Sequence, residues 1–156
     1  MKRIATLILS AALLGWCDLS VAQITYGGSP WSEGIRPEPL YLPTIDRAAL
    51  ALEDGVTDRY KEAPWRFGVE HDVSFNAVSH GSWSIEHGHR VWRLVIAAPG
   101  ASNLSLRFER FDVPKGGQLF LYAADGSAFV GALDYRNMKP WGGLATGVLA
   151  TNELVI

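Results

Sequence analysis

Cysteine is almost absent from this sequence, and it has no apolar run long enough to cross a membrane. The one cysteine among the 156 residues is Cys17, which lies in an N-terminal stretch that we expect to be removed. A domain without cysteine has no disulfide bond and depends on its hydrophobic core for stability. The apolar run over residues 4–16 is shorter than the roughly 20 residues that a membrane-spanning helix needs. The sequence therefore predicts neither a disulfide-rich scaffold nor a membrane-spanning protein.

The N-terminal segment has the three parts of a signal peptide. Two basic residues precede the apolar run, and the small residues Ser20 and Ala22 occupy the −3 and −1 positions of a cleavage site. We therefore expect residues 1–22 to be a signal peptide and the exported chain, secreted or periplasmic, to begin at Gln23.

A lipid-modified cysteine is the alternative interpretation of this N-terminus. Such a cysteine needs a small residue directly before it, whereas Trp16 precedes Cys17. We therefore place Cys17 in the discarded peptide.

Neither sign of charge dominates the sequence. The chain has 14 basic and 16 acidic residues, and the predicted signal peptide contains two of the basic and one of the acidic ones. The remaining 134 residues thus carry a formal charge of −3, with histidine counted as neutral. This weak acidity argues against nucleic acid or an anionic membrane surface as the partner of the exported chain. Its length suits one domain with a sizeable core.

Three regions follow the predicted signal peptide. Residues 23–43 contain a Gly-Gly-Ser-Pro stretch and three further prolines, which predict an extended leader on the domain surface. Residues 44–63 are predicted to form a helix and a connector. Residues 64–156 are predicted to form a β-domain, because the apolar period changes to two.

The predicted helix covers residues 44–54. Apolar residues recur there at helical spacing. Thr44 is expected to cap the helix, Asp46 lies in the first turn where the helix dipole favours negative charge, and Gly55 is expected to end it.

A hairpin is predicted around His87-Gly88. A two-residue turn with glycine second is typical of type I′ geometry, and it joins strands over residues 81–86 and 89–97. This register pairs residues whose numbers sum to 175, so that Trp83 faces Trp92. The same alternation puts both indoles on the core side, together with Ile85, Leu94 and Ile96.

Further short strands with Gly and Pro turns complete the β-domain. An early strand over residues 66–75 is expected to point Phe67, Val69, Val73 and Phe75 inward. The later strands are expected over residues 103–109, 118–123, 128–133, 145–149 and 153–156. This pattern predicts a mainly β fold, an antiparallel β-sandwich of jelly-roll type with one short N-terminal helix. The final apolar residues, 154–156, are expected to be exposed, which would indicate a chain truncated within a strand.

Catalytic motifs are not found. No serine lies in a G-x-S-x-G or Gly-Asp-Ser-Gly stretch, so nothing marks an activated nucleophile. Paired carboxylates occur at Glu53-Asp54 and around the turn at Glu109 and Asp112, and solvation explains both groups. We assign no catalytic residue and no cofactor.

Histidine and tryptophan supply the remaining site candidates. His80, His87 and His89 lie close in sequence, but no fourth ligand is evident, so we treat them as turn histidines and only as weak candidates for a metal site. Trp31 and Trp141 lie in predicted loops, and they are the candidates for exposed aromatic contacts.

Four stretches of the sequence follow one another in a familiar order. They are IDRAALALED (45–54), WRFG (65–68), GSW (81–83) followed by VWRL (91–94), and LSLRF (104–108) leading through Phe111 and VPKGG (113–117) to LFLY (119–122). In their order and spacing they resemble the N-terminal pro-region of secreted bacterial serine proteases of the lysyl endopeptidase (Achromobacter protease I) type. The resemblance extends over roughly residues 40–156.

This resemblance implies a non-catalytic role. In such precursors a trypsin-like protease domain follows the pro-region in the same chain, and the pro-region helps it to fold or keeps it inactive. The catalytic His, Asp and Ser of the protease have no matching positions here. The expected partner is therefore the cognate serine protease domain.

Two other functions stay open at this stage. A secreted β-sandwich that binds carbohydrate or a cell-surface polymer would present exposed, coplanar aromatic rings. A small enzyme would need a polar cleft, of which the sequence gives no sign.

Overall fold

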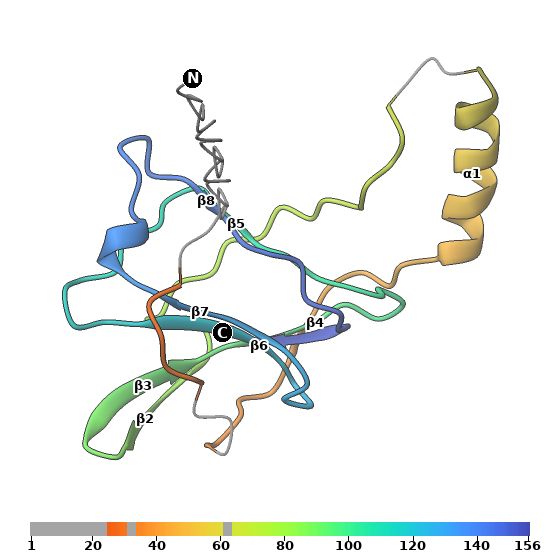
Figure 1. Cartoon of the computed structure of the whole chain (residues 1–156). Coiled ribbons are helices and arrows are strands. Elements are labelled where there is room, and N and C mark those ends of the chain that lie inside the picture. The colour runs from red at the N-terminus through yellow and green to blue at the C-terminus, as the bar shows by residue number, and fades with distance from the viewer. Residues whose placement is uncertain (1–24, 31–33, 61–63) are drawn as a thin grey trace, which may run out of the picture.

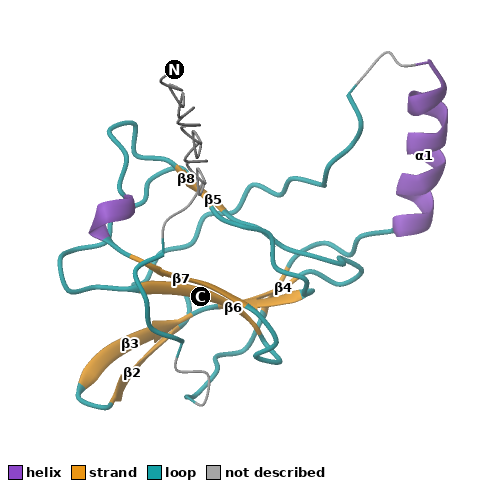
Figure 2. Cartoon of the chain, viewed as in Figure 1, coloured by secondary structure: helices purple, strands orange, loops and turns teal. Residues whose placement is uncertain are grey.

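The computed structural model describes residues 25–30, 34–60 and 64–156. The predicted signal peptide and Trp31 lie outside these residues. The described chain is β-rich, with several sheets and one α-helix (Figure 1). Much of it runs as loop between short strands (Figure 2). Within the described residues, no helix has both the length and the apolar character needed to cross a membrane.

A five-stranded sheet forms the centre of the fold. Its strand order is β1-β4-β9-β6-β7, and only the β1–β4 pair is parallel. The strands are β1 (Leu40–Tyr41), β4 (Val95–Ala97), β9 (Glu153–Val155), β6 (Leu119–Ala123) and β7 (Phe129–Leu133).

The last strand of the chain is a central one. β9 pairs with β4 on one side and with β6 on the other, and Leu154 and Val155 are fully buried. Ile156 exchanges two backbone hydrogen bonds with Leu94. The expectation that residues 154–156 are exposed is therefore wrong, because strands distant in sequence enclose them on both sides.

Two smaller sheets and a short helix complete the framework. β2 (Ser82–Glu86) pairs with β3 (His89–Arg93), and β5 (Arg107–Phe108) pairs with β8 (Leu144–Ala145). The 3₁₀ helix η1 (Tyr135–Asn137) follows β7, and the Asp134 side chain caps it.

Alternating residues of the central strands pack on opposite faces of the five-stranded sheet, as the two-residue period of a strand requires. One face carries the main core, formed by Phe111, Leu121, Leu133, Leu144, Leu149 and Leu154. The other face carries a smaller cluster of Val95, Tyr122 and Val155.

The β2–β3 hairpin has the predicted turn and register. His87 has a φ of 49° and Gly88 a φ of 80°, as a type I′ turn requires, and Trp83 pairs with Trp92. The strand after the turn is shorter than predicted, because β3 ends at Arg93 and β4 begins at Val95 in a different sheet.

Because the chain changes sheet here, the prediction that Trp83 and Ile85 lie on the core side is wrong. Leu94 and Ile96 are buried, but Trp83 is 52% exposed and Ile85 is 78% exposed. The alternation of the hairpin does not continue into the five-stranded sheet, since the chain passes from one sheet to the other at Leu94.

The helix α1 (Arg47–Tyr60) starts and ends later than predicted. Its cap is Asp46 instead of Thr44, because the Asp46 carboxylate accepts hydrogen bonds from the backbone N–H groups of Ala48 and Ala49, each at 3.0 Å. The helix continues through Gly55, which has no positive φ there. None of its residues is buried, and it stands apart from the sheets (Figure 1).

The leader forms one edge strand of the five-stranded sheet, β1, and contacts the other edge strand, β7. The backbone N–H of Tyr26 donates to the carbonyl of Ala132 in β7, and the Arg136 guanidinium lies 3.4 Å from the centre of the Tyr26 ring. At the opposite edge, β1 pairs with β4. The leader thus supplies backbone contacts at both ends of the strand order.

Candidate functional site

The three histidines lie at separate features of the hairpin region. His80 is half-buried with its ring against Phe75, His87 occupies the exposed turn, and His89 pairs with Glu86 across the hairpin. Over the described ranges, no group of three or more His, Cys, Asp or Glu side chains is arranged to hold a metal ion.

Of the two tryptophans proposed for exposed contacts, Trp141 lies in the loop after η1 and is 76% exposed. Trp31 lies outside the described residues. Trp83 has its indole N–H donating to the carbonyl of Ala77, and the Arg90 guanidinium lies 4.6 Å from the centre of its ring.

The carboxylates of Glu53 and Asp54 both form ion pairs with Arg66. Arg66 donates from Nη2 to Glu53 at 2.8 Å and from Nε to Asp54 at 3.0 Å. The hydrogen bond to Glu53 is the main reason why the pKa of Arg66 lies above its ordinary value. These ion pairs connect Arg66, which follows the predicted connector, to the helix α1.

Residues 66–75 do not form the predicted strand. Phe67 is 94% exposed, Val69 43% and Val73 47%, and only Phe75 of the four predicted inward residues is half-buried. A strand needs a neighbour for its backbone hydrogen bonds, and within the described residues this segment pairs with no sheet. Its apolar residues therefore face solvent.

These side chains form part of a longer exposed apolar stretch. Between residues 65 and 85, seven large apolar side chains are each at least 43% exposed. We call this set the apolar surface; it consists of Trp65, Phe67, Val69, Val73, Val78, Trp83 and Ile85.

An ion pair between Arg93 and Glu86 joins the two strands of the β2–β3 hairpin. The Arg93 guanidinium is 3% exposed and binds Glu86 through both of its Nη atoms, with an Nη2–Oε2 distance of 2.7 Å. Arg93 Nε also donates to the Tyr122 hydroxyl at 3.3 Å, and the Ser84 hydroxyl donates to Glu86 at 2.6 Å. The hydrogen bond from Arg93 lowers the pKa of Glu86 to about 2.

The leader lies against this ion pair. A Cβ added at Gly34 would overlap the Arg93 guanidinium. The guanidinium cannot easily move away, because Glu86 and Tyr122 fix it. Only glycine fits at this position without displacing the ion pair.

The sequence contains a signal for this ion pair. The register set by His87-Gly88 puts Ser84, Glu86 and Arg93 on one face of the hairpin, because their pairing positions differ by even numbers. Their common face follows from the same register that pairs Trp83 with Trp92.

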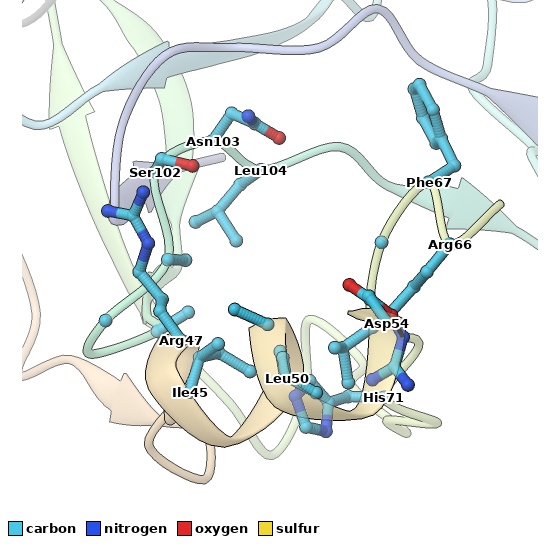
Figure 3. Close-up of a pocket in the computed structure, with 16 residues that line it drawn as sticks. Ile45, Arg47, Leu50, Asp54, Arg66, Phe67, His71, Ser102, Asn103 and Leu104 are labelled. Atoms are coloured by element: carbon cyan, nitrogen blue, oxygen red, sulfur yellow. Dashed lines mark ion pairs between the residues drawn. The ribbon is translucent and has the colours of Figure 1, made fainter. Parts of the chain in front are cut away.

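A groove of about 300 Å³ lies beside α1 (Figure 3). One wall is the first half of the helix, with Arg47, Leu50 and Asp54. Opposite lies the loop over residues 98–104, and residues 66–71 close one end. No sequence pattern predicted this groove, since its walls come from three segments distant along the chain.

No known protein family model matches the chain, and no solved structure matches it significantly.

Proposed function

We propose that this chain is the non-catalytic pro-region of a secreted serine endopeptidase precursor, in which it assists folding of the protease or holds it inactive. The protease would be of lysyl endopeptidase type and part of the same precursor. A jelly-roll-like sandwich and cleavage of residues 1–22 belong to the same proposal. The signal-peptide pattern and the resemblance over residues 40–156 support it.

The observation that carries the proposal is the apolar surface. Seven exposed large apolar side chains follow one another within 21 residues of sequence, and large exposed apolar patches are a feature of surfaces that bind another protein. Burial of apolar surface contributes a favourable free energy of about 25 cal/mol per Å². A partner that binds only the folded state of a protease stabilises that state. A non-catalytic module can promote folding in this way without any chemistry of its own.

The first test is the coding DNA downstream of codon 156. The proposal expects the reading frame to continue into a chymotrypsin-like domain. A stop codon with no protease sequence behind it would contradict the proposal.

The second test measures the interaction itself. The encoded protease domain is denatured and refolded with the exported chain added in trans, and peptidase activity is recorded. We expect recovery of activity to require the chain, and addition of the chain to folded protease distinguishes inhibition from assisted folding.

Matched variants assign the effect to the apolar surface. Val78→Ser changes a side chain that is 98% exposed within this surface, and Val148→Ser changes one that is 50% exposed outside it. We expect only Val78→Ser to weaken the effect on the protease. Equal effects of the two variants would rule out the apolar surface as the contact.

A second candidate function, binding of carbohydrate or a cell-surface polymer, is favoured by the exposed indole of Trp141. Titration with a panel of polysaccharides, read by tryptophan fluorescence, tests it. A response that disappears in Trp141→Ala would support the second candidate, and a flat response would exclude it for that panel.

A further inference from the structure

The outer edge of β2 is not covered by another strand of the described chain. β2 pairs only with β3, in a two-stranded sheet that projects from the body of the molecule (Figure 2). Glu86 and His89 close the two-residue turn as a hydrogen-bonded pair. Because hydrogen-bonded and non-hydrogen-bonded pairs alternate along an antiparallel ladder, the backbone N–H and C=O groups of Trp83 and Ile85 point away from β3. Among the described residues, these groups have no main-chain partner.

The sequence of β2 leaves this edge open to pairing. Proteins usually protect an edge strand with charged side chains, whereas residues 82–85 are uncharged and the two apolar side chains among them are 52% and 78% exposed. The one charged residue of β2, Glu86, is bound to Arg93. The other edge of the hairpin differs, because β3 carries the exposed Arg90 and its chain passes into β4 of the central sheet.

A second copy of β2 complements the edge of the first. When two β2 strands lie antiparallel with Ser84 at the centre, Trp83 of each copy faces Ile85 of the other. Both pairs are then of the hydrogen-bonded kind, which gives four backbone hydrogen bonds between the copies. An aromatic side chain opposite a β-branched one also stabilises an antiparallel pair. Glu86 falls opposite Ser82 of the second copy, so like charges do not face each other along the paired strands.

We propose that two copies of the exported chain associate through their β2 edges and form one antiparallel four-stranded sheet, in the order β3-β2-β2-β3. The contact is two-fold symmetric, because the same edge is used by both copies, and it therefore closes at a dimer instead of growing into a filament. The dimer does not depend on the proposed function, and its strand pairing uses only Trp83 and Ile85 of the apolar surface.

The length of β2 limits the strength of the dimer. A pair of five-residue strands covers less area than a standard protein interface, which buries about 1,200–2,000 Å². Each new hydrogen bond also replaces bonds to water, so its net contribution is small. We therefore expect a weak dimer, with a dissociation constant of about 0.1–1 mM.

The first test follows the exported chain alone over a range of concentrations, from about tenfold below to about tenfold above this dissociation constant. Sedimentation equilibrium should show the mass changing from one copy to two. Amide hydrogen exchange of Trp83 and Ile85 should slow by about fivefold at the highest concentration, where about a fifth of the chains remain single. The Arg90 amide, on the outer edge of β3, is the internal control and should not slow.

Matched proline variants locate the contact. Ile85→Pro removes an N–H group that points away from β3, and an edge strand accepts proline at such a position. We expect it to weaken the dimer by at least about tenfold. Arg90→Pro makes the same change on the outer edge of β3 and should leave the dimer unchanged. Ile85→Lys, which keeps the backbone and adds a charge to the edge, is the second variant if Ile85→Pro alters the hairpin.

Each result decides for or against the β2 contact. A dimer that is lost with the Ile85 variants and kept with Arg90→Pro would support it. The proposal is wrong if the unaltered chain stays a single copy at the highest concentration, or if Ile85→Pro and Ile85→Lys dimerise like the unaltered chain. It is also wrong if a dimer forms while the amides of Trp83 and Ile85 exchange as fast as in the single chain.

Discussion

At the scale of single residues, Arg93 is a buried charge with several partners. Its guanidinium is buried, bound to Glu86 and Tyr122, and covered by the backbone of Gly34. A charge taken out of water is tolerated only while its partners are in place. The stability of the hairpin therefore depends on the charge state of Glu86.

Stability is expected to depend on the ionisation of Glu86. Its pKa of about 2 in the folded chain lies below its ordinary value of 4.5. The ionised carboxylate thus stabilises the fold above pH 4.5, and this contribution is lost as the pH falls from about 4.5 toward 2. Glu86→Gln should unfold at lower urea concentration than the unaltered chain at pH 7, and the difference should shrink toward pH 2.

A control distinguishes this effect from general acid unfolding. Glu109→Gln, at an exposed carboxylate, should follow the unaltered chain at every pH. Asp134, whose pKa is lowered chiefly by the hydrogen bond from Arg136, leaves some acid sensitivity in every variant. If the deficit of Glu86→Gln persisted undiminished at pH 2, the ion pair would not be its cause.

The main core makes a second prediction at the residue scale. Leu154 is fully buried between β4 and β6, whereas Leu52 on α1 is 75% exposed. Leu154→Ala should lower the free energy of unfolding by about 2–5 kcal/mol, because it leaves a cavity. Leu52→Ala should change it by less than about 0.5 kcal/mol. Urea denaturation of both variants measures the contrast.

At the scale of elements, the leader and the hairpin are packed against each other at one point. Gly34→Ala would place a methyl group into the Arg93 guanidinium. We expect this variant to be less stable by about 1–3 kcal/mol, as for other overpacked sites. Gly68→Ala, at a glycine with open space around its Cβ position, should be neutral or more stable by up to about 1 kcal/mol. Equal thermal unfolding of the two variants would show that the leader does not press on the ion pair.

The start of α1 provides a prediction about helix capping. Asp46 accepts two backbone hydrogen bonds at the helix N-terminus, whereas no such bond involves Thr44 in the described chain. Asp46→Ala should therefore reduce helix stability by about 1 kcal/mol, and Thr44→Ala should have little effect. Far-UV circular dichroism during thermal unfolding tests the pair, and the reverse order would restore Thr44 as the cap.

At the scale of the whole molecule, the five-stranded sheet unites the two ends of the described chain. β1 near the start and β9 at the end both pair with β4. Contacts between residues so distant in sequence form only when the chain folds as a unit. Loss of either end therefore affects the same strand.

Removal of residues 153–156 should prevent cooperative folding. It takes out β9 from between β4 and β6 and leaves the backbone groups of both strands unpaired. We expect loss of the near-UV circular dichroism signal and of a sharp unfolding transition. Removal of the four leader residues 27–30 is the control, and it should keep both features, since the sheet order remains intact.

Local features of the fold could be predicted from sequence because local interactions decide them. The turn at His87-Gly88 needs only two residues that tolerate positive φ, and the register of Trp83 with Trp92 follows from it. The helix was predicted from its apolar period, although its cap and its end were misplaced. There, Asp46 and Thr44 were both acceptable caps, and Gly55 was acceptable inside or after the helix.

The candidate sites could not be predicted in the same way, because neighbours distant in sequence create them. Phe67 and Ile85 have the residue types of a core. Within the described residues, Phe67 is exposed because its segment joins no sheet, and Ile85 is exposed although it lies in the two-stranded β2–β3 sheet. The groove at Arg47 exists because residues 66–71 and 98–104 come to lie beside α1.

The sequence by itself therefore determined the turns, the helix, the β-rich character and the pattern of a signal peptide. Only the tertiary structure decided which apolar residues are buried, where the chain changes sheets at Leu94, and which charges are paired. The physical reason is that a turn or a helix is stabilised by contacts within a few residues, whereas burial and ion pairing depend on strands brought together from opposite ends of the chain.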